Sequence, residues 1–298
     1  MLGSMIVDVL SRAGDLRVRA TYRGDREAID SHFRPRSVEW ISFDAERDNI
    51  GQILVGEPWI INAIGIIKPL IHEDRAEEVR RAVLVNSLFP FAVAAAAARG
   101  DARVIQIATD CVFSGREGSY HEDSPHDPLD VYGKTKSLGE VAASHFLNLR
   151  CSIVGPELRG HLSLLDWFLS QPRHASVRGF VNHRWNGITT LHFAQIVLGL
   201  VQSNSRISGT HHIVPHDSVT KAQLLREFAT AFERKDIQVQ DAAAPEPVDR
   251  TLSTKSPLMN DDIWHASGRD EIPNIRTMLN ELARLRDADP SDQDAVSR

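Results

Sequence analysis

Apolar positions in the first half of the chain alternate between a helical and a strand-like period. Ile6, Val7 and Leu10 recur at helical spacing within 2–13, whereas Val18, Ala20 and Tyr22 alternate with other residues, as in a strand. The same criteria predict further strands at 38–43, 59–63, 103–108 and 149–154, and helices at 77–99, with Pro90 inside it as a kink or a break into two helices, and at 132–146. Alternating strands and helices predict a doubly wound α/β fold around a parallel sheet.

The pattern becomes less regular beyond about Gly155. We expect helices at 164–169, 191–201 and 221–232 and a strand at 210–214, with Thr220 and Gln223 in a capping-box spacing. The interpretation is a sheet domain over 1–155 and a smaller mixed α/β lobe over 156–286, some of whose segments return to the core. Residues 287–298 are polar, with little apolar periodicity, and are expected to be a disordered tail.

Composition excludes several functional classes. The formal net charge is −6 and the basic residues are scattered, so nothing favours nucleic acid or an anionic membrane as the partner. No apolar run approaches a membrane span and no signal segment precedes the first helix, so we expect a cytoplasmic protein. Cys111 and Cys151 have no disulfide-scaffold or metal spacing, and the histidines form no zinc motif, so no metal is expected.

The first residues are similar to the end of a phosphate-binding loop. Met1-Leu2-Gly3 runs directly into the first predicted helix, as the last glycine of a Gly-x-x-Gly-x-x-Gly loop does in a dinucleotide-binding (Rossmann-type) fold. The preceding strand and glycines are not in the sequence. We therefore expect the sheet to lack its first, central strand and the edges of the flanking strands to be open. An ordinary helix at a chain start fits the same residues.

A Tyr-x-x-x-Lys spacing supplies the candidate chemistry. Tyr132 and Lys136 lie four residues apart on a predicted helix and so share one face. An ammonium beside a phenol lowers the phenol's pKa, which would suit Tyr132 for proton transfer. Thr109 ends a buried strand, where ligands of open α/β sheets bind. A surface Tyr and Lys, and a threonine that only caps a turn, fit the same pattern.

Several motifs in order give a resemblance to a known family. They are Thr-Asp-x-Val-Phe-x-Gly at 109–115, Tyr-Gly-Lys-Thr-Lys at 132–136 with Gly139-Glu140, Asn-Ala-Ile-Gly at 62–65, Asn86, the Tyr-x-Glu-Asp loop at 120–123, and, more weakly, 185–190. Together they resemble the dTDP-4-dehydrorhamnose reductase family of the extended short-chain dehydrogenases/reductases, which bind sugar nucleotides. The similarity covers roughly the first half of the chain.

The resemblance implies a role for each matching residue. Tyr132 would be the general acid, Lys136 its partner, Thr109 the hydroxyl that positions the keto oxygen, and Asp110 a neighbour of the substrate. The cofactor would contact Tyr132, Lys136 and nine further residues: Met1, Leu2, Gly3, Arg23, Asp44, Ala45, Ala63, Ile64 and Gly65. The second lobe would bind the substrate. The implied reaction is NAD(P)H-dependent reduction of a 4-keto group on a nucleotide-linked deoxysugar, in a protein that could act as a homodimer.

The residues themselves add a cofactor preference and one departure. Arg23 follows the first predicted strand of the sequence as given, which would be the second strand of a complete fold, and lies near Thr21; an arginine at this place accommodates a 2′-phosphate and favours NADP(H) over NAD(H). Ile153 stands where the family has an aromatic residue near the sugar, which leaves the substrate open. Trp185 and Arg250, the latter as a diphosphate ligand, are further candidates, although packing or solvent exposure would explain both equally well.

Two rival functions remain at this point. A nucleotide-sugar epimerase or dehydratase would share the fold, and a non-catalytic NADP-binding regulatory subunit would keep the fold and the cofactor site. The Thr109, Tyr132 and Lys136 trio argues against the second rival, and the short beginning of the chain argues mildly for it.

Overall fold

The structure is a computed structural model that describes residues 1–24, 26, 29, 37–158 and 162–287. The helices are α1 (Leu2–Arg12), α3 (Ala76–Ala82), α4 (Phe89–Arg99), α5 (Val131–Leu138), α6 (Leu164–Leu169), α7 (Thr190–Gln202), α8 (Lys221–Ala231), α9 (Pro257–His265) and α10 (Ile275–Asp287). The strands are β1 (Val18–Tyr22), β2 (Val38–Ser42), β3 (Trp59–Asn62), β4 (Arg103–Thr109), β5 (Phe146–Cys151), β6 (Ile153–Val154), β7 (Ser176–Phe180), β8 (His183–Trp185), β9 (Ile188–Thr189), β10 (Gly209–His212), β11 (Val219–Thr220), β12 (Gln238–Ala242) and β13 (Val248–Asp249). The predicted tail at 288–298 lies outside the described residues.

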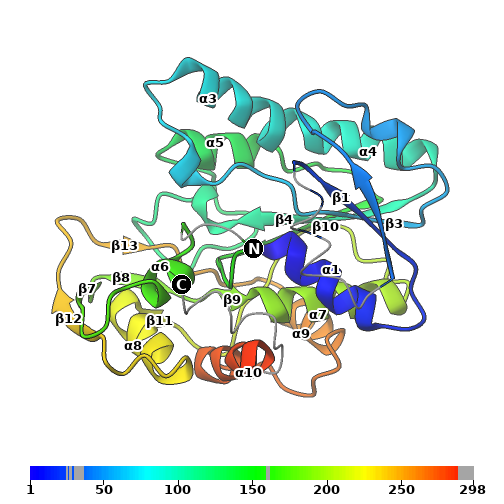
Figure 1. The fold of residues 1–298 in the computed structure, drawn as a ribbon. Coiled ribbons are helices and arrows are strands. Elements are labelled where there is room, and N and C mark those ends of the chain that lie inside the picture. The colour runs from blue at the N-terminus through cyan, green and yellow to red at the C-terminus, as the bar shows by residue number, and fades with distance from the viewer. Residues whose placement is uncertain (25, 27–28, 30–36, 159–161, 288–298) are drawn as a thin grey trace.

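The protein is a three-layer α/β structure with a parallel central sheet, as predicted. Four strands hydrogen-bond in the order β10-β5-β4-β3, all parallel, and β1 pairs with β2, also parallel. Helices α3, α4 and α5 cover one face and α1 and α7 the other (Figure 1). Apolar residues fill both interfaces: Leu2 and Ile6 of α1 join the core with Ile196 of α7, whereas Val93 of α4 packs in a second cluster with Val104 of β4.

The two parts of the sheet do not meet. β1 pairs only with β2 and β3 only with β4, and no strand of the described residues lies between them. A cavity of about 880 Å³ occupies this place, lined by residues of both strands, among them Val18, Ala20 and Ile61. Within the described part of the chain, the facing edges of β1 and β3 therefore have no strand partner.

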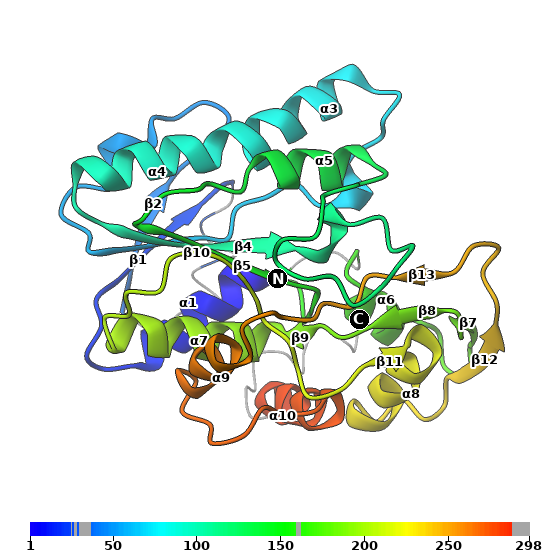
Figure 2. The same cartoon turned by 180° about the vertical axis from the view of Figure 1, so that it is seen from behind.

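The smaller lobe is built from the second half of the chain. It contains the pairs β12-β7, β8-β11 and β8-β13 together with α6 and α8, and lies beyond the end of the central sheet (Figure 2). Two segments of this half return to the core: β10 pairs with β5, and α7 packs against α1. The capping box of α8 is present, with the Thr220 and Gln223 side chains each accepting a hydrogen bond from the other's backbone N–H.

The long helix expected at 77–99 is interrupted. It consists of α3, a π-helical turn at Val83–Leu88 and α4, and Pro90 lies in the first turn of α4. The wide turn accommodates the proline, which has no backbone N–H and clashes with the preceding turn of a regular helix. The span 76–99 is long and apolar enough to cross a membrane by length and composition, but 56% of its most apolar window is buried within the protein.

The helix expected at 132–146 is wrong in its second half. α5 ends at Leu138, with Gly139 as its C-cap, and a Cβ on Gly139 would lie 1.9 Å from the Asn86 carbonyl oxygen, so only glycine fits beside Asn86 here. Gln106 of β4 then donates to the Gly139 carbonyl at 2.8 Å, and Asn148 donates to that of Val141 at 3.0 Å. These buried amides hold 139–145 in a non-helical path, and β5 begins at Phe146.

Candidate active site

Thr109 and Tyr132 meet at the carboxyl end of β4. Thr109 is the last residue of that strand and is buried, and its hydroxyl accepts from the Cys111 amide at 3.2 Å and donates to Asp110 Oδ1 at 3.2 Å. Tyr132 lies in the first turn of α5, with its phenol close enough to the Thr109 side chain for that side chain to influence its pKa. The structure thus brings together the two hydroxyl groups that the sequence suggested as partners.

Gly133 makes this approach possible. A Cβ at this position would lie 2.2 Å from the Cys111 carbonyl oxygen and 2.7 Å from Pro128 Cβ. The first turn of α5 therefore lies directly against 110–112, closer than any other residue would allow. Asp130 caps the helix, because its carboxylate accepts from the Gly133 amide at 2.8 Å. The cap and the glycine together fix the place of Tyr132 beside Thr109.

The protonation of the site is set by burial rather than by the tyrosine–lysine pair. Burial raises the pKa of the Tyr132 phenol, and the Thr109 side chain opposes this only in part. Lys136 donates to the Ile107 carbonyl at 2.9 Å, and burial lowers the pKa of its ammonium to about 8. Our expectation that Lys136 lowers the Tyr132 pKa is therefore wrong for this structure, since desolvation outweighs any attraction.

Asn86 holds the segment after β3 against α5. Its Oδ1 accepts from the Ile66 amide at 2.8 Å, and its Nδ2 donates to the Ile66 carbonyl at 3.0 Å and to Thr135 Oγ1 at 3.2 Å. Ala63, Ile64 and Gly65, the predicted cofactor contacts, belong to this segment. A fully buried asparagine thus couples the predicted cofactor loop to the helix that carries Tyr132.

Four of the predicted cofactor residues, Gly3, Arg23, Ala63 and Ile64, line the cavity between β1 and β3. A Cβ on Gly3 would lie 3.8 Å from Ala63 Cβ, so the first turn of α1 faces the segment after β3. Met1 is the N-cap of α1 and gives no side-chain cap, which leaves the first amides of this helix available to an anion. Leu2 is buried in the core, so only its backbone could serve a cofactor.

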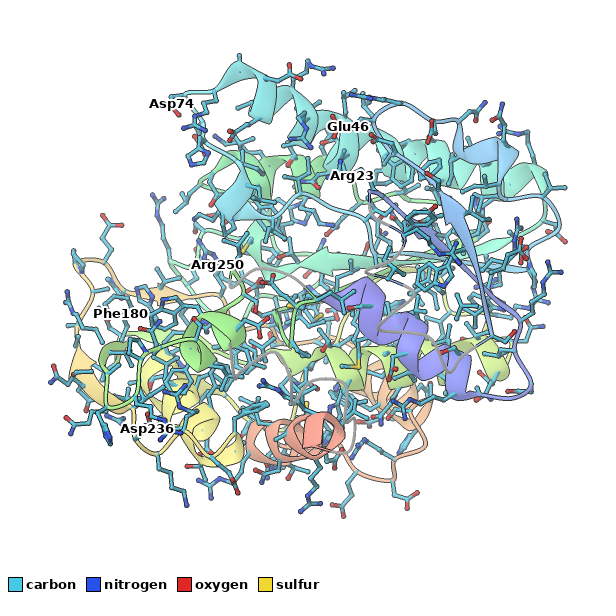
Figure 3. The ribbon with its side chains drawn as sticks, viewed as in Figure 1. Arg23, Glu46, Asp74, Phe180, Asp236 and Arg250 are labelled. Atoms are coloured by element: carbon cyan, nitrogen blue, oxygen red, sulfur yellow. The ribbon has the colours of Figure 1, made fainter. Side chains whose placement is uncertain are left out.

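The remaining cofactor candidates lie after β1 and β2. Arg23 is 61% exposed and donates to Glu46 at 3.2 Å, and Glu46 also forms an ion pair with Arg81 at 2.8 Å (Figure 3). The Asp44 carboxylate accepts from the Glu46 amide at 3.0 Å, and Ala45 packs against the second core cluster. Because both an arginine and a glutamate lie here, the local charge does not favour a 2′-phosphate as clearly as Arg23 alone suggested.

A second cavity opens beside Tyr132. It has a volume of about 510 Å³ and is lined by Tyr132, Asp130 and a segment of 68–73. Lys68 forms an ion pair with Asp130 at 2.7 Å, and Glu73 accepts from the Val131 amide at 2.8 Å. The segment is thereby attached to the start of α5. Sequence reasoning missed these contacts, since nothing local links 68–73 to a helix some 60 positions later.

Trp185 and Lys221 of the smaller lobe have surroundings that the sequence did not predict. Trp185, expected in a turn, lies in β8, is buried and donates from Nε1 to Ser152 Oγ at 2.8 Å. Lys221, which the sequence did not single out, has its ammonium 5.6 Å from the Trp185 ring centroid, and burial lowers its pKa to about 8 although the Asp110 carboxylate acts in the opposite direction. In the described part of the chain, no three His, Cys, Asp or Glu residues are placed to hold a metal ion.

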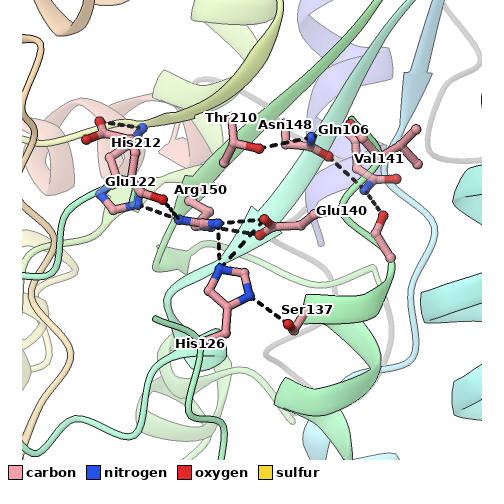
Figure 4. Close-up of polar contacts among 11 residues, drawn as sticks. Gln106, Glu122, His126, Ser137, Glu140, Val141, Asn148, Arg150, Thr210 and His212 are labelled. Carbon is pink, nitrogen blue, oxygen red and sulfur yellow. Dashed lines mark hydrogen bonds and ion pairs between the residues drawn. The ribbon is translucent and has the colours of Figure 1, made fainter. Parts of the chain in front are cut away.

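A buried network of charged and histidine side chains holds the segment that follows α5 (Figure 4). Arg150 of β5 donates to both carboxylate oxygens of Glu140, at 2.7 and 2.6 Å, and hydrogen-bonds with His126 at 2.7 Å and His212 at 3.0 Å. Burial and the Arg150 charge lower the pKa of both histidines, that of His212 to about 4. Glu140 follows α5 directly, so the network anchors the end of the helix that carries Tyr132 and Lys136.

Sequence comparison assigns the family. Residues 70–286 match the family described as "RmlD substrate binding domain". This chain belongs to that family. The expectation drawn from the motifs is thereby confirmed, and the matched region includes Thr109, Tyr132, Lys136 and the smaller lobe of this RmlD-type protein.

Curated relatives carry related names. The dTDP-4-dehydrorhamnose reductase of Mycolicibacterium smegmatis is 43% identical over 72 residues, 23% of this chain and 22% of the relative. The dTDP-4-keto-6-deoxy-D-glucose reductase of Streptomyces niveus is 25% identical over 215 residues, 70% of this chain and 74% of the relative. The "Spore coat polysaccharide biosynthesis protein SpsK" of Bacillus subtilis is 41% identical over 69 residues. The chain spans about a quarter of the length of the first and third of these relatives.

Solved structures share the fold. A dTDP-4-dehydrorhamnose reductase from Bacillus anthracis in complex with NADP superposes with a TM-score of 0.67 at 15% identity, over 90% of this chain and 99% of the other. MoeE5 in complex with UDP-glucuronic acid and NAD superposes with a TM-score of 0.71 at 16% identity, over 95% of this chain and 96% of the other. At these identities the likeness establishes the Rossmann-type fold of this chain.

Proposed function

We propose that this RmlD-type protein is an NAD(P)H-dependent reductase of a 4-keto group on a nucleotide-linked deoxysugar. The single observation that carries the proposal is the Tyr132 phenol, held in the first turn of α5 beside the buried Thr109 side chain at the carboxyl end of β4. Two hydroxyl groups at this point can hold one carbonyl oxygen between them, which is what reduction of a ketone requires. The two reductase names among the relatives support the same reaction class.

The residues fit a bound nicotinamide cofactor, which supplies the hydride when present. The uncapped first turn of α1, with Gly3 facing Ala63, suits the negative charge of a pyrophosphate. The segment 63–65, held by Asn86, would lie along the nicotinamide. The names of the solved neighbours include both NADP and NAD, and the pair of Arg23 and Glu46 does not by itself distinguish the two cofactors. We keep NADP(H) as the preferred cofactor because the Arg23 side chain is more exposed than that of Glu46.

The chain's own groups would handle the proton. Thr109 would donate to the keto oxygen and fix its position, and Tyr132 would transfer its proton to that oxygen as it becomes an alkoxide. Burial suits Tyr132 to this role, because a raised pKa keeps the phenol protonated at neutral pH until a stronger base forms beside it. Lys136 would donate to a cofactor hydroxyl in place of, or in addition to, the Ile107 carbonyl.

The test is a reductase assay with matched controls. The full chain is mixed with NADPH or NADH and a dTDP-4-keto-6-deoxy sugar, and the loss of reduced nicotinamide is followed. We expect Tyr132→Phe to lower kcat by about 10²- to 10⁴-fold, the usual contribution of a general acid. Tyr120→Phe, which removes a phenol that only accepts from the amides of Gly115 and Glu117, should leave kcat of the folded protein unchanged.

A second matched pair lies on α5 itself. Lys136→Met should abolish turnover, whereas Lys134→Met, two residues earlier and exposed, should not. Turnover by Tyr132→Phe at the rate of the unmodified protein would refute the mechanism. If the unmodified protein consumes no reduced nicotinamide with any 4-keto nucleotide sugar, the proposed reaction itself is wrong.

A further inference from the structure

The segment that leads from β3 to α3 is attached to the start of α5 by two side chains. The Lys68 ammonium lies 2.7 Å from Asp130 Oδ2, and the Glu73 carboxylate accepts from the Val131 amide at 2.8 Å. Asp130 is the N-cap of α5 and Val131 its first residue, so both contacts are made to the same turn. Tyr132 follows directly, and the segment therefore lies against the turn that carries the candidate general acid.

Further contacts fix the other end of this segment. Its first residues form a 3-10 turn at Lys68–Leu70. The Glu78 carboxylate of α3 accepts from the His72 amide at 2.8 Å and hydrogen-bonds with His72 Nδ1 at 2.7 Å, and Arg75 donates to the other Glu78 oxygen at 3.0 Å. Because the segment is bound to α3 as well as to α5, its ion pair with α5 joins two ordered elements.

Asp130 uses its two carboxylate oxygens for different partners. Oδ1 accepts from the Gly133 amide at 2.8 Å and so caps α5, whereas Oδ2 faces Lys68. The Asp130 side chain is only 20% exposed. In the described residues, Lys68 is the only cation within ion-pair distance of this carboxylate, and Arg250 acts on it from farther away. Without Lys68, a largely uncompensated negative charge would therefore lie two residues from Tyr132.

The Tyr132 phenol faces three groups that oppose its ionisation. Asp130 and Tyr132 line the same cavity of about 510 Å³, together with Lys68. The Asp110 carboxylate and the Cys111 thiol act on the phenol from the segment after β4, and together with Asp130 and burial they raise its pKa. In the proposed reaction, the Tyr132 O–H bond breaks, the proton joins the alkoxide oxygen of the product, and a phenolate remains. A negative charge nearby makes that phenolate less stable.

We propose that Lys68 is a positioning residue for the proposed reaction and acts through Asp130. Its ammonium compensates the Asp130 carboxylate while Tyr132 becomes negative, and the contact of Glu73 with α5 keeps the lysine in that place. Asp130 is needed as the helix cap, and Lys68 offsets the effect of its charge on the phenol. The inference rests on the proposed function and adds to it a residue that lies outside the motifs at 109–115 and 132–136.

The test is a double-mutant cycle on the full chain, assayed with reduced nicotinamide and a dTDP-4-keto-6-deoxy sugar. Lys68→Met should lower kcat about tenfold, because one uncompensated charge near an ionising group changes its equilibrium by about that factor. Lys68→Arg should recover most of this loss. Adding Asp130→Asn to Lys68→Met removes the charge and keeps a side chain that can cap the helix, so kcat should return to within about threefold of the unmodified protein.

Hydrogen exchange separates charge compensation from mere attachment. Exchange of the amides at 130–134, followed by mass spectrometry without substrate, should be faster in Lys68→Met and in the double variant alike, because both lose the ion pair. Charge compensation predicts that kcat recovers in the double variant while exchange stays fast. A purely structural role predicts that both stay impaired. Lys134→Met, an exposed lysine on the same helix, should leave kcat unchanged.

Three results would overturn the inference and leave the proposed reductase intact. They are an unchanged kcat in Lys68→Met, a double variant as slow as Lys68→Met, and unchanged amide exchange in Lys68→Met, which would show that the ion pair does not hold the segment. A protein that reduces no 4-keto nucleotide sugar in its unmodified form would instead refute the proposed function, and the role of Lys68 would fall with it.

Discussion

Replacing Gly133 by alanine should disturb the candidate active site more than the fold. The new Cβ would lie 2.2 Å from the Cys111 carbonyl oxygen, whereas ordinary contact begins near 3.4 Å. The first turn of α5 must therefore move about 1 Å away from 110–112, since the Cys111 carbonyl oxygen belongs to the backbone and cannot rotate away. Tyr132, one residue earlier, moves with it and away from Thr109.

Two magnitudes follow from this displacement. Overpacking of this size costs about 1–3 kcal/mol of unfolding free energy, which corresponds to a fall in Tm of roughly 2–10 °C. A misplacement of about 1 Å at a catalytic group costs roughly 10²-fold in rate. We therefore expect Gly133→Ala to remain folded at room temperature while kcat for keto-sugar reduction falls by about two orders of magnitude.

The assay compares Tm and kcat for two glycine variants. Gly14→Ala is the control, because a Cβ there meets nothing within 4 Å and its φ is not in the left-handed region. It should match the unmodified protein in both quantities. If Gly133→Ala lowers Tm but leaves kcat of the folded protein unchanged, the link from this glycine to the position of Tyr132 is wrong. If neither changes, the close packing itself is refuted.

Three further predictions concern the surroundings of the site. Arg150→Met leaves the Glu140 carboxylate buried and unpaired, so the free energy of unfolding measured in urea should fall by about 3–5 kcal/mol. The control, Arg226→Met, removes an exposed ion pair and should lower the free energy of unfolding by less than about 1 kcal/mol. A loss as small as that in Arg150→Met would contradict the prediction. His212 is neutral in the folded protein, because its pKa is lowered to about 4, whereas the imidazole of the unfolded chain takes up a proton below about pH 6.5. The free energy of unfolding should therefore fall by roughly 1 kcal/mol between pH 6 and pH 5. His212→Gln should reduce this pH dependence, and an unchanged pH dependence would show that another group causes it. Asn86→Leu should weaken nicotinamide cofactor binding about tenfold in a fluorescence titration by releasing 62–66; an unchanged Kd would show that this segment does not contact the cofactor.

The sequence by itself determined the local elements and the residue types of the site. Apolar spacing located α1, β1 to β4 and α6 to α8 to within a few residues, because amphipathic periods record which face is buried. The ordered motifs at 109–115 and 132–136 predicted Thr109, Tyr132 and Lys136 as partners, and the first two lie side by side at the end of β4. The family match over 70–286 confirms the family that these motifs indicated.

Contacts between distant segments determined the features of the site that the local sequence pattern did not predict. Gly139, which follows α5, must be glycine because the Asn86 backbone, some 50 positions earlier, occupies the space beside it, and the distant Gln106 side chain donates to its carbonyl. Burial by distant segments, and not the neighbouring lysine, sets the pKa of Tyr132. Arg250 donates to the Phe113 carbonyl only because the smaller lobe folds back on the end of β4. Each of these depends on contacts between segments far apart in the chain, whose positions follow from packing and not from spacing.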